Sequence, residues 1–212
     1  MKLFLLSGGL DSVASLKKYI EEFGNDGVIA LHVEFGSNIR HMPEKQAVQE
    51  LCEKYQVPVF IQRVDFIPVV DFDVLLQCAL SFHYRQTQVD EIYFGFTGIG
   101  AGKHFSDLLA WADEYVTHCN TFDLGEALKR PIFRTNIEGL SRKDLIAILQ
   151  GDSFWSCRQP MVDGDVYEPC GRCGTCREFI SEGVPHGSKH VRPSLPQRLS
   201  SFAVISGSNP YV

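Results

Sequence analysis

Two groups of residues in this 212-residue chain have the types and spacing needed for chemistry. The first is the hexapeptide Ser7–Ser12, in which two glycines, two hydroxyls and a carboxylate follow an apolar run. Glycines leave no Cβ between the main chain and a ligand, and the N–H groups that begin a helix attract anions. The second group consists of Cys157, Cys170, Cys173 and Cys176. The hexapeptide predicts a phosphate site, and the cysteines predict a metal site.

The phosphate loop, Ser7–Ser12, requires a strand before it and a helix after it. Residues 1–6 are mostly apolar, and Val13–Phe23 repeats apolar residues at helical spacing up to Gly24. This places the unpaired N–H groups of a helix start at the loop. The Gly-Lys-Ser/Thr ending of the nucleotide-kinase loop is absent. The alternative is an ordinary turn in which Asp11 or Ser12 caps the helix.

The four late cysteines form a compact spacing pattern. Twelve residues separate the first from the second, and two residues lie in each later gap. Four thiolates at such spacing can close a tetrahedral zinc site, and Gly171 and Gly174 permit tight turns between them. An iron–sulfur cluster and free or redox-active cysteines are the alternatives, and we favour structural zinc. We expect the other three cysteines to be buried apolar residues: Cys52, Cys78 and Cys119.

Apolar runs alternate with helical patterns over the first 120 residues. Strands are expected at 1–6, 27–35, 58–61 and 91–95, and helices at 13–23, 42–55, 72–86 and 104–118. This alternation predicts an α/β fold, a Rossmann-like parallel sheet with helices on both faces. Ligands bind such sheets beyond the carboxyl ends of the strands. The chemistry is therefore expected in the segments 7–12, 35–41, 65–72 and 96–103.

The later part of the chain has a different character. An extended piece at 130–133 precedes a helix from Ser141 to about Gln150, which Ser141 and Asp144 begin as a capping box. We divide the chain into a nucleotide-binding domain at 1–150, a metal-binding segment at 151–182 and an irregular tail at 183–212, which is rich in Pro, Ser and Gly.

Composition limits the classes of partner. The net charge of −6 argues against non-specific nucleic-acid binding. No apolar stretch reaches about 20 residues, so we expect no membrane span. The glycine turn comes six residues after the start and leaves no room for a signal peptide, so we expect a cytoplasmic location.

The two motifs together resemble one family. Ser7–Ser12 matches the Ser-Gly-Gly-x-Asp-Ser signature of the PP-loop, or N-type, ATP pyrophosphatases. With the late segment Ser156-Cys157…Pro169–Arg177, the chain resembles the 7-cyano-7-deazaguanine synthases of the queuosine pathway. Weaker similarities to family motifs lie between them: Phe35-Gly36, Arg40-His41, Pro131-Ile132 and Lys143.

The resemblance implies an activity and a set of residues. Such an enzyme adenylates 7-carboxy-7-deazaguanine with release of pyrophosphate and transfers it to ammonia, giving the amide and then the nitrile. It would use ATP, Mg²⁺ and Zn²⁺ and would form a homodimer. The implied catalytic residues are Asp11, Ser12 and Lys143. The implied ATP-binding residues are Leu6, Ser7, Gly8, Gly9, Leu10, Asp11 and Ser12. The implied substrate contacts are Phe35, Arg40 and His41, and the implied zinc ligands are Cys157, Cys170, Cys173 and Cys176.

Two segments depart from the family. Val70-Asp71-Phe72 stands where its members usually carry an Arg-Asn pair. The family's acidic, tyrosine-containing loop that holds the deazaguanine is replaced here by residues 95–104. The identities of the acid that is activated and of the amine that accepts it therefore stay open. The same adenylation with a protein or another amine as acceptor is the first alternative. A tRNA-modifying PP-loop enzyme and a non-catalytic nucleotide-binding relative are the others.

Overall fold

The computed structural model describes residues 1–36, 38–65, 71–86, 89–97, 101–121, 129–185 and 190–191. Within these ranges, the side chains at 71–73, 84–86, 101–109, 119 and 190–191 are not described. Most of the predicted tail at 183–212, most of the segment 65–72 and the side chain of Cys119 therefore lie outside the described residues.

Five parallel strands form the central sheet, in the order β3-β2-β1-β4-β5. They are β1 (Lys2–Leu5), β2 (Val28–Phe35), β3 (Val59–Val64), β4 (Glu91–Tyr93) and β5 (Ile132–Arg134). The chain moves outward from β1 to β3 and then crosses to β4 on the other side of β1. The loops after β1 and β4 therefore lie side by side at the point where the strand order reverses.

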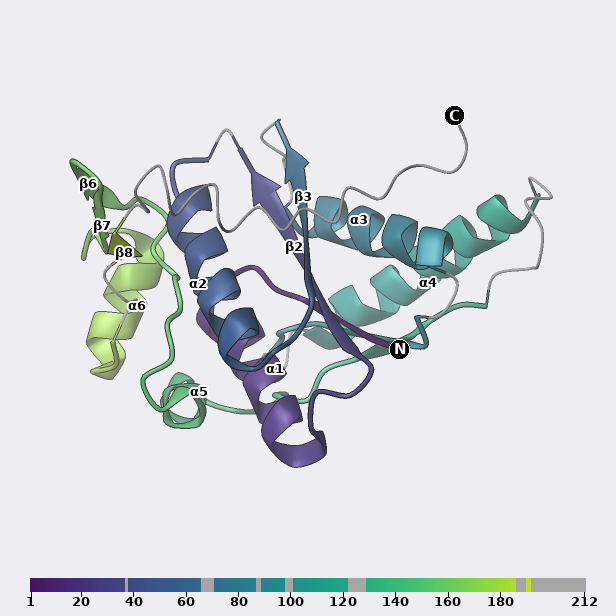
Figure 1. Ribbon diagram of the computed structural model, residues 1–212, viewed down its shortest axis with the longest axis horizontal. Coiled ribbons are helices and arrows are strands. Elements are labelled where there is room, and N and C mark those ends of the chain that lie inside the picture. Colours follow the sequence, from purple (N-terminus) through teal and green to yellow (C-terminus); the bar gives the residue numbers. More distant parts are fainter. Residues whose placement is uncertain are drawn as a thin grey trace.

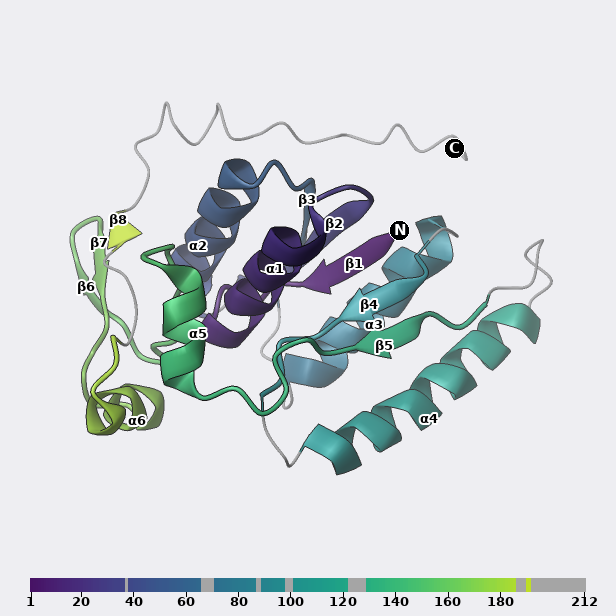
Figure 2. The ribbon, with the colours of Figure 1, turned by 90° about the horizontal axis from the view of Figure 1, so that it is seen from below.

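Helices cover both faces of the sheet, as the sequence predicted (Figures 1 and 2). They are α1 (Leu10–Phe23), α2 (His41–Lys54), α3 (Asp71–Gln86), α4 (Ala101–Thr121) and α5 (Arg142–Leu149). One core holds Phe4 and Leu6 against α1, α2 and α5, and the opposite core holds Leu3 and Leu5 against α3 and α4. Alternate residues of β1 thus face opposite cores, as the pleat of a strand requires.

A smaller unit lies at the end of the molecule opposite α4 (Figure 1). It contains α6 (Gly174–Glu182) and the antiparallel strands β6 (Met161–Asp163), β7 (Val166–Glu168) and β8 (His190–Val191). Its small core is formed by Trp155, Tyr167 and three of the four late cysteines. Phe154, Phe179 and Val184 instead enter the core under α1 and α5. Residues of the predicted metal-binding segment therefore belong to the same hydrophobic core as the sheet, and the domain boundary near residue 150 stays a prediction.

Two smaller expectations are confirmed. Ser141 and Asp144 form the capping box that begins α5. Cys52 and Cys78 are buried and free. Among the described residues, no helix is long and apolar enough to cross a membrane.

Candidate functional site

The phosphate loop connects β1 to α1 by a turn that requires glycine. Gly8 has φ +81°, and a Cβ there would lie 2.4 Å from the backbone oxygen of Glu44 in α2. Gly9 is the N-cap of α1, without a side-chain cap. Asp11 and Ser12 are therefore in the first turn of the helix, and the alternative in which one of them is its cap is wrong. The first turn of α1 thus belongs to the loop.

Hydroxyl groups accept the hydrogen bonds of the loop amides. The N–H of Ser7 donates to Ser12 Oγ over 3.2 Å, and the N–H of Gly9 donates to Ser7 Oγ over 3.2 Å. The two hydroxyls are 3.1 Å apart, and that of Ser12 also donates to the backbone oxygen of Gly9. A phosphate oxygen can replace such hydroxyl acceptors, so the residues present fit a polyphosphate.

The loop after β4 packs directly against the start of α1. A Cβ on Gly95 would lie 2.5 Å from the backbone nitrogen of Ser12, so only glycine permits this approach. Further along, Asn136 accepts a 2.6 Å hydrogen bond from Ser15 Oγ, and Thr135 donates to the backbone oxygen of Phe96. Sequence reasoning missed Gly95 as a site residue, although a glycine directly after an apolar strand is a usable signal.

Asp11 is a partly buried carboxylate at this edge. Burial raises its pKa, and the positive charge of Arg142 acts in the opposite direction. Arg142 begins α5, where it binds Glu178 over 2.7 Å and lies over the ring of Phe179. The predicted catalytic Lys143 follows it and is exposed. Arg142 is thus a cation near the loop that the sequence analysis did not single out.

The predicted substrate contacts lie at the end of β2 and the start of α2. Phe35 is in the core that faces α3 and α4. Arg40 is the N-cap of α2 and pairs with Glu44 over 3.1 Å. The ring nitrogen Nδ1 of His41 lies 2.6 Å from the backbone oxygen of Asn38. The structure therefore places these residues on neighbouring segments, and their contact with substrate stays a prediction.

A buried histidine connects β2 to the loop. His32 lies 2.7 Å through Nδ1 from the backbone oxygen of Leu6, the residue before the loop. Burial lowers its pKa to about 4, so the ring is neutral near pH 7. The ring of His32 therefore supports the structure at the end of β1.

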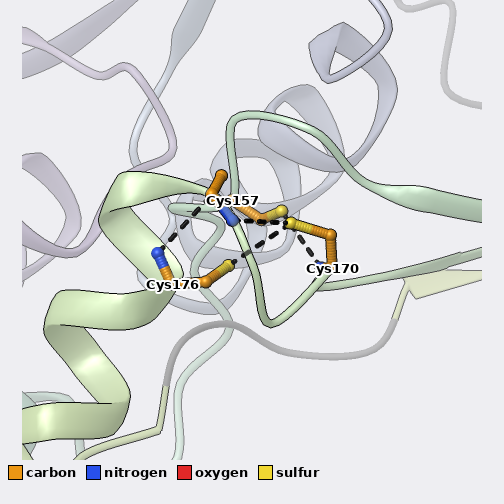
Figure 3. Close-up of side chains that lie close together, drawn as sticks. Cys157, Cys170 and Cys176 are labelled. Atoms are coloured by element: carbon orange, nitrogen blue, oxygen red, sulfur yellow. Dashed lines mark hydrogen bonds between the residues drawn. The ribbon is translucent and has the colours of Figure 1, made fainter.

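The four late cysteines converge on one point. Their sulfur atoms all lie within 4.8 Å of one another, and Figure 3 shows three of these side chains together. Cys170 Sγ and Cys176 Sγ are 4.0 Å apart. Sulfur atoms around a tetrahedral zinc ion are about 3.8 Å apart, from a Zn–S bond of about 2.3 Å. The donor set therefore fits one metal ion.

Backbone amides favour the thiolate form of these cysteines. The N–H of Cys170 donates to Cys157 Sγ over 3.3 Å, and the N–H of Cys173 donates to Cys170 Sγ over 3.3 Å. Burial opposes ionisation of Cys173, but hydrogen bonds, first that from the N–H of Cys176, outweigh it and lower its pKa to about 6. Such N–H donors stabilise negative sulfur in metal sites.

The two sites are contiguous. The N–H of Trp155 donates to the backbone oxygen of Gly8 over 2.7 Å, and the N–H of Leu10 donates to Ser156 Oγ over 3.3 Å. Cys157, one of the four cysteines, is the next residue. The sequence analysis treated the loop and the cysteines as separate motifs and did not predict this contact.

The comparison with protein families concerns the N-terminal part of the chain. Residues 1–96 match the family model described as queuosine biosynthesis protein QueC. The family resemblance is confirmed over these residues, and the match supports an ATP-using PP-loop enzyme. No curated protein matches the sequence significantly.

One solved structure with a similar arrangement is the U34-tRNA thiolase NcsA from Methanococcus maripaludis with its [4Fe-4S] cluster. It has 16% sequence identity and a TM-score of 0.49, and the match covers 86% of this chain. The chain spans 63% of the length of that protein, less than two thirds.

Proposed function

We propose that this protein adenylates a carboxylate and transfers the acyl group to ammonia. The premise is that residues 1–96, which contain the PP-loop Ser7–Ser12, are a divergent form of the QueC family's sequence. The most favoured acid is 7-carboxy-7-deazaguanine, and the products are the amide and then the 7-cyano compound. The observation that supports this most is the intact Ser7–Ser12 loop, built as a strand-to-helix turn at the reversal point of the sheet.

The proposed first step splits ATP between its α- and β-phosphates. A carboxylate oxygen of the substrate attacks the α-phosphorus, and pyrophosphate leaves with the electrons of the broken P–O bond. The amides of the loop and the hydroxyls of Ser7 and Ser12 would hold the phosphates, and Asp11 would orient Mg²⁺ or the phosphates. Mg²⁺ would supply charge screening between the two anions. Ammonia then attacks the acyl carbon, AMP leaves with the electrons of the C–O bond, and the amide forms. A second ATP would activate the amide oxygen in the same way, and its departure as AMP would give the nitrile.

Cations must also face the developing negative charge. We propose Lys143 for this role, with Arg142 beside it. Lys143→Met should lower the adenylation rate by at least about tenfold, because a cation facing the developing negative charge is lost. The thermal midpoint should stay unchanged, because the Lys143 side chain is exposed. Arg142→Met should lower both, since its ion pairs with α6 are lost too. Steady-state kinetics and thermal melts of the two variants provide the check, and a normal rate in Lys143→Met would remove this lysine from the mechanism.

We propose that the four cysteines hold a structural zinc ion. Four thiolates leave no open coordination position, so the site would stabilise the segment rather than take part in the reaction. Elemental analysis should find about one zinc per chain. Iron together with visible absorbance would instead show a cluster.

The direct test combines purified protein, ATP, Mg²⁺ and 7-carboxy-7-deazaguanine, with and without ammonium. AMP and pyrophosphate should form, and the nitrile should appear only with ammonium. Asp11→Ala should lose this activity, and Asp26→Ala, a change of an exposed aspartate beyond the other end of α1, should keep it. No AMP with any deazaguanine acid would refute the proposal.

A second candidate follows from residues 95–104, which replace the family's deazaguanine loop. The same adenylate could be passed to a protein or another amine. In that case AMP would form with the acid, but ammonium would not yield the nitrile. Acid-independent adenylation of a tRNA base would point to a nucleic-acid substrate, against which the net charge of −6 counts.

A further inference from the structure

The first amide of α1 has an acceptor from a distant part of the chain. The loop amides of Ser7 and Gly9 donate to hydroxyls within the loop, but the N–H of Leu10 donates to Ser156 Oγ. Beside it, the N–H of Trp155 donates to the backbone oxygen of Gly8. Two consecutive residues therefore hold the phosphate loop at two points, one through a donor and one through an acceptor.

The same two residues are fixed to the cysteine cluster. The indole of Trp155 is fully buried in the small core with Cys157, Cys173 and Cys176, and its Nε1 donates to the backbone oxygen of Cys157 over 2.9 Å. Ser156 stands between Trp155 and Cys157. A displacement of Cys157 therefore moves the hydroxyl that faces the N–H of Leu10.

We propose that Ser156 is a positioning residue of the phosphate loop and that metal bound by the four cysteines sets its place. Metal occupancy then determines nucleotide affinity without any contact between metal and nucleotide. The nucleotide part of this inference rests on the proposed function. A bound ion would fix the four sulfur atoms in place, so its loss frees the cysteine segment to move and releases residues 155–156 from the loop.

The coupling can be measured without any nucleotide. Hydrogen exchange of the peptide that covers Ser7–Ser12 should be compared in metal-loaded protein, in chelated and dialysed protein, and in metal-loaded Ser156→Ala. A lost hydrogen bond of about 1 kcal/mol corresponds to about fivefold faster exchange at Leu10. The matched control is Ser181→Ala, because that hydroxyl bonds only within α6, to the backbone oxygen of Glu178.

Nucleotide affinity supplies the second readout. Trp111 and Trp155 are the two tryptophans of the chain, so Trp111→Phe leaves Trp155, which lies between the loop and the cysteines, as the sole tryptophan for selective excitation. ATP titrations with Mg²⁺ should give a Kd at least about fivefold weaker after chelation and in Ser156→Ala, matching the loss of one such bond. Zinc addition should restore the chelated protein, and Ser156→Thr, which keeps a hydroxyl, should bind nearly as the parent does.

The outcomes separate the two proposals. Equal exchange and equal Kd in loaded, chelated and Ser156→Ala protein would overturn the coupling. Ser156→Ala keeps all four cysteines, so this variant tests the role of the Ser156 hydroxyl even if circular dichroism shows that the chelated protein is unfolded. If metal-loaded protein binds no ATP at all, the proposed function fails, while the exchange result still decides whether the cysteine segment positions the loop.

Discussion

Gly8 is the residue on which the shape of the phosphate loop depends most. Its φ of +81° and the 2.4 Å approach of a Cβ to the Glu44 oxygen are two separate demands for glycine. Gly139 has a similar φ of +75° but open space around its Cβ position. A comparison of alanine variants at these two glycines therefore separates the energetic cost of backbone strain from that of the steric contact.

Gly8→Ala should destabilise the fold more than Gly139→Ala. Both changes carry the left-handed backbone cost of about 1–2 kcal/mol, and the contact with α2 should add about 2 kcal/mol at Gly8. Urea unfolding of the two variants measures this difference. Equal free energies of unfolding would show that α2 does not constrain the loop.

Asp11 links the chemistry to stability. Because burial raises the pKa of its carboxyl above the usual 3.8, the folded state holds this proton more tightly than the unfolded state does. Its ionisation therefore lowers the free energy of unfolding as the pH rises from below 3.8 toward neutrality.

Asp11→Asn removes that pH-dependent cost. The stability of the variant relative to the parent should rise with pH over this window, while adenylation falls at least about tenfold because a charged ligand is lost. Unfolding curves at several pH values, together with the AMP assay, provide the check. A stability difference that falls with rising pH would contradict the assigned burial of this carboxylate.

Single-residue contacts were predictable only where a local motif carried them. Ser7–Ser12 and the four cysteines are recognisable in the sequence because neighbouring residues form each group. Gly95 and Arg142 reach the loop only because β4 lies beside β1 and α5 packs on α1. These contacts depend on tertiary structure, which the periodicity of one segment does not contain.

At the scale of elements, a buried ionic network joins α1, α2 and the segment after α5. Lys17 is 2% exposed, and its Nζ lies 3.2 Å from Asp152 and 2.7 Å from the backbone oxygen of Leu149. Asp152 also binds Lys54 and the hydroxyl of Tyr55. This network holds the chain two residues before Phe154, where the metal-binding segment enters the core.

Asp152→Ala removes the nearer carboxylate of the buried Lys17 ammonium and leaves it Glu21, 3.6 Å away and half-exposed. Breaking one side of a buried ion pair costs about 3 kcal/mol or more, so the thermal midpoint should fall clearly. Asp163→Ala in the exposed strand β6 is the matched control and should lie within about 0.5 kcal/mol of the parent. Calorimetry of both variants measures this, and an unchanged midpoint in Asp152→Ala would show that the network is unimportant.

The elements of the central sheet and the helices that cover it were predictable, and the elements of the cysteine segment were not. Apolar periodicity predicted β1–β4 and α1–α5, because all of them except the partly buried edge strand β3 bury a continuous face. Strand β6 has no buried residue, so it lacks the alternation that marks a strand. Helix α1 begins at Leu10 rather than at Val13, since the last three residues of the hexapeptide form its first turn.

At the scale of the whole molecule, the sheet order brings distant motifs together. The carboxyl ends of β1 and β4 are adjacent, and residues 155–156 close the same edge from the far end of the chain. Alternating strands and helices predicted the parallel sheet, but the docking of the cysteine segment on the phosphate loop could not be derived from spacing. That contact makes the loop and the cysteine cluster contiguous.

The central claim is that this site activates a carboxylate as an acyl-adenylate. Exchange of labelled pyrophosphate into ATP tests it most directly, because the exchange needs the reversible first step and no amine acceptor. With metal-loaded protein, Mg²⁺ and 7-carboxy-7-deazaguanine, label should enter ATP, and it should not do so without the acid or in Asp11→Ala. Acid-independent exchange, or release of ADP and phosphate instead, would contradict the account.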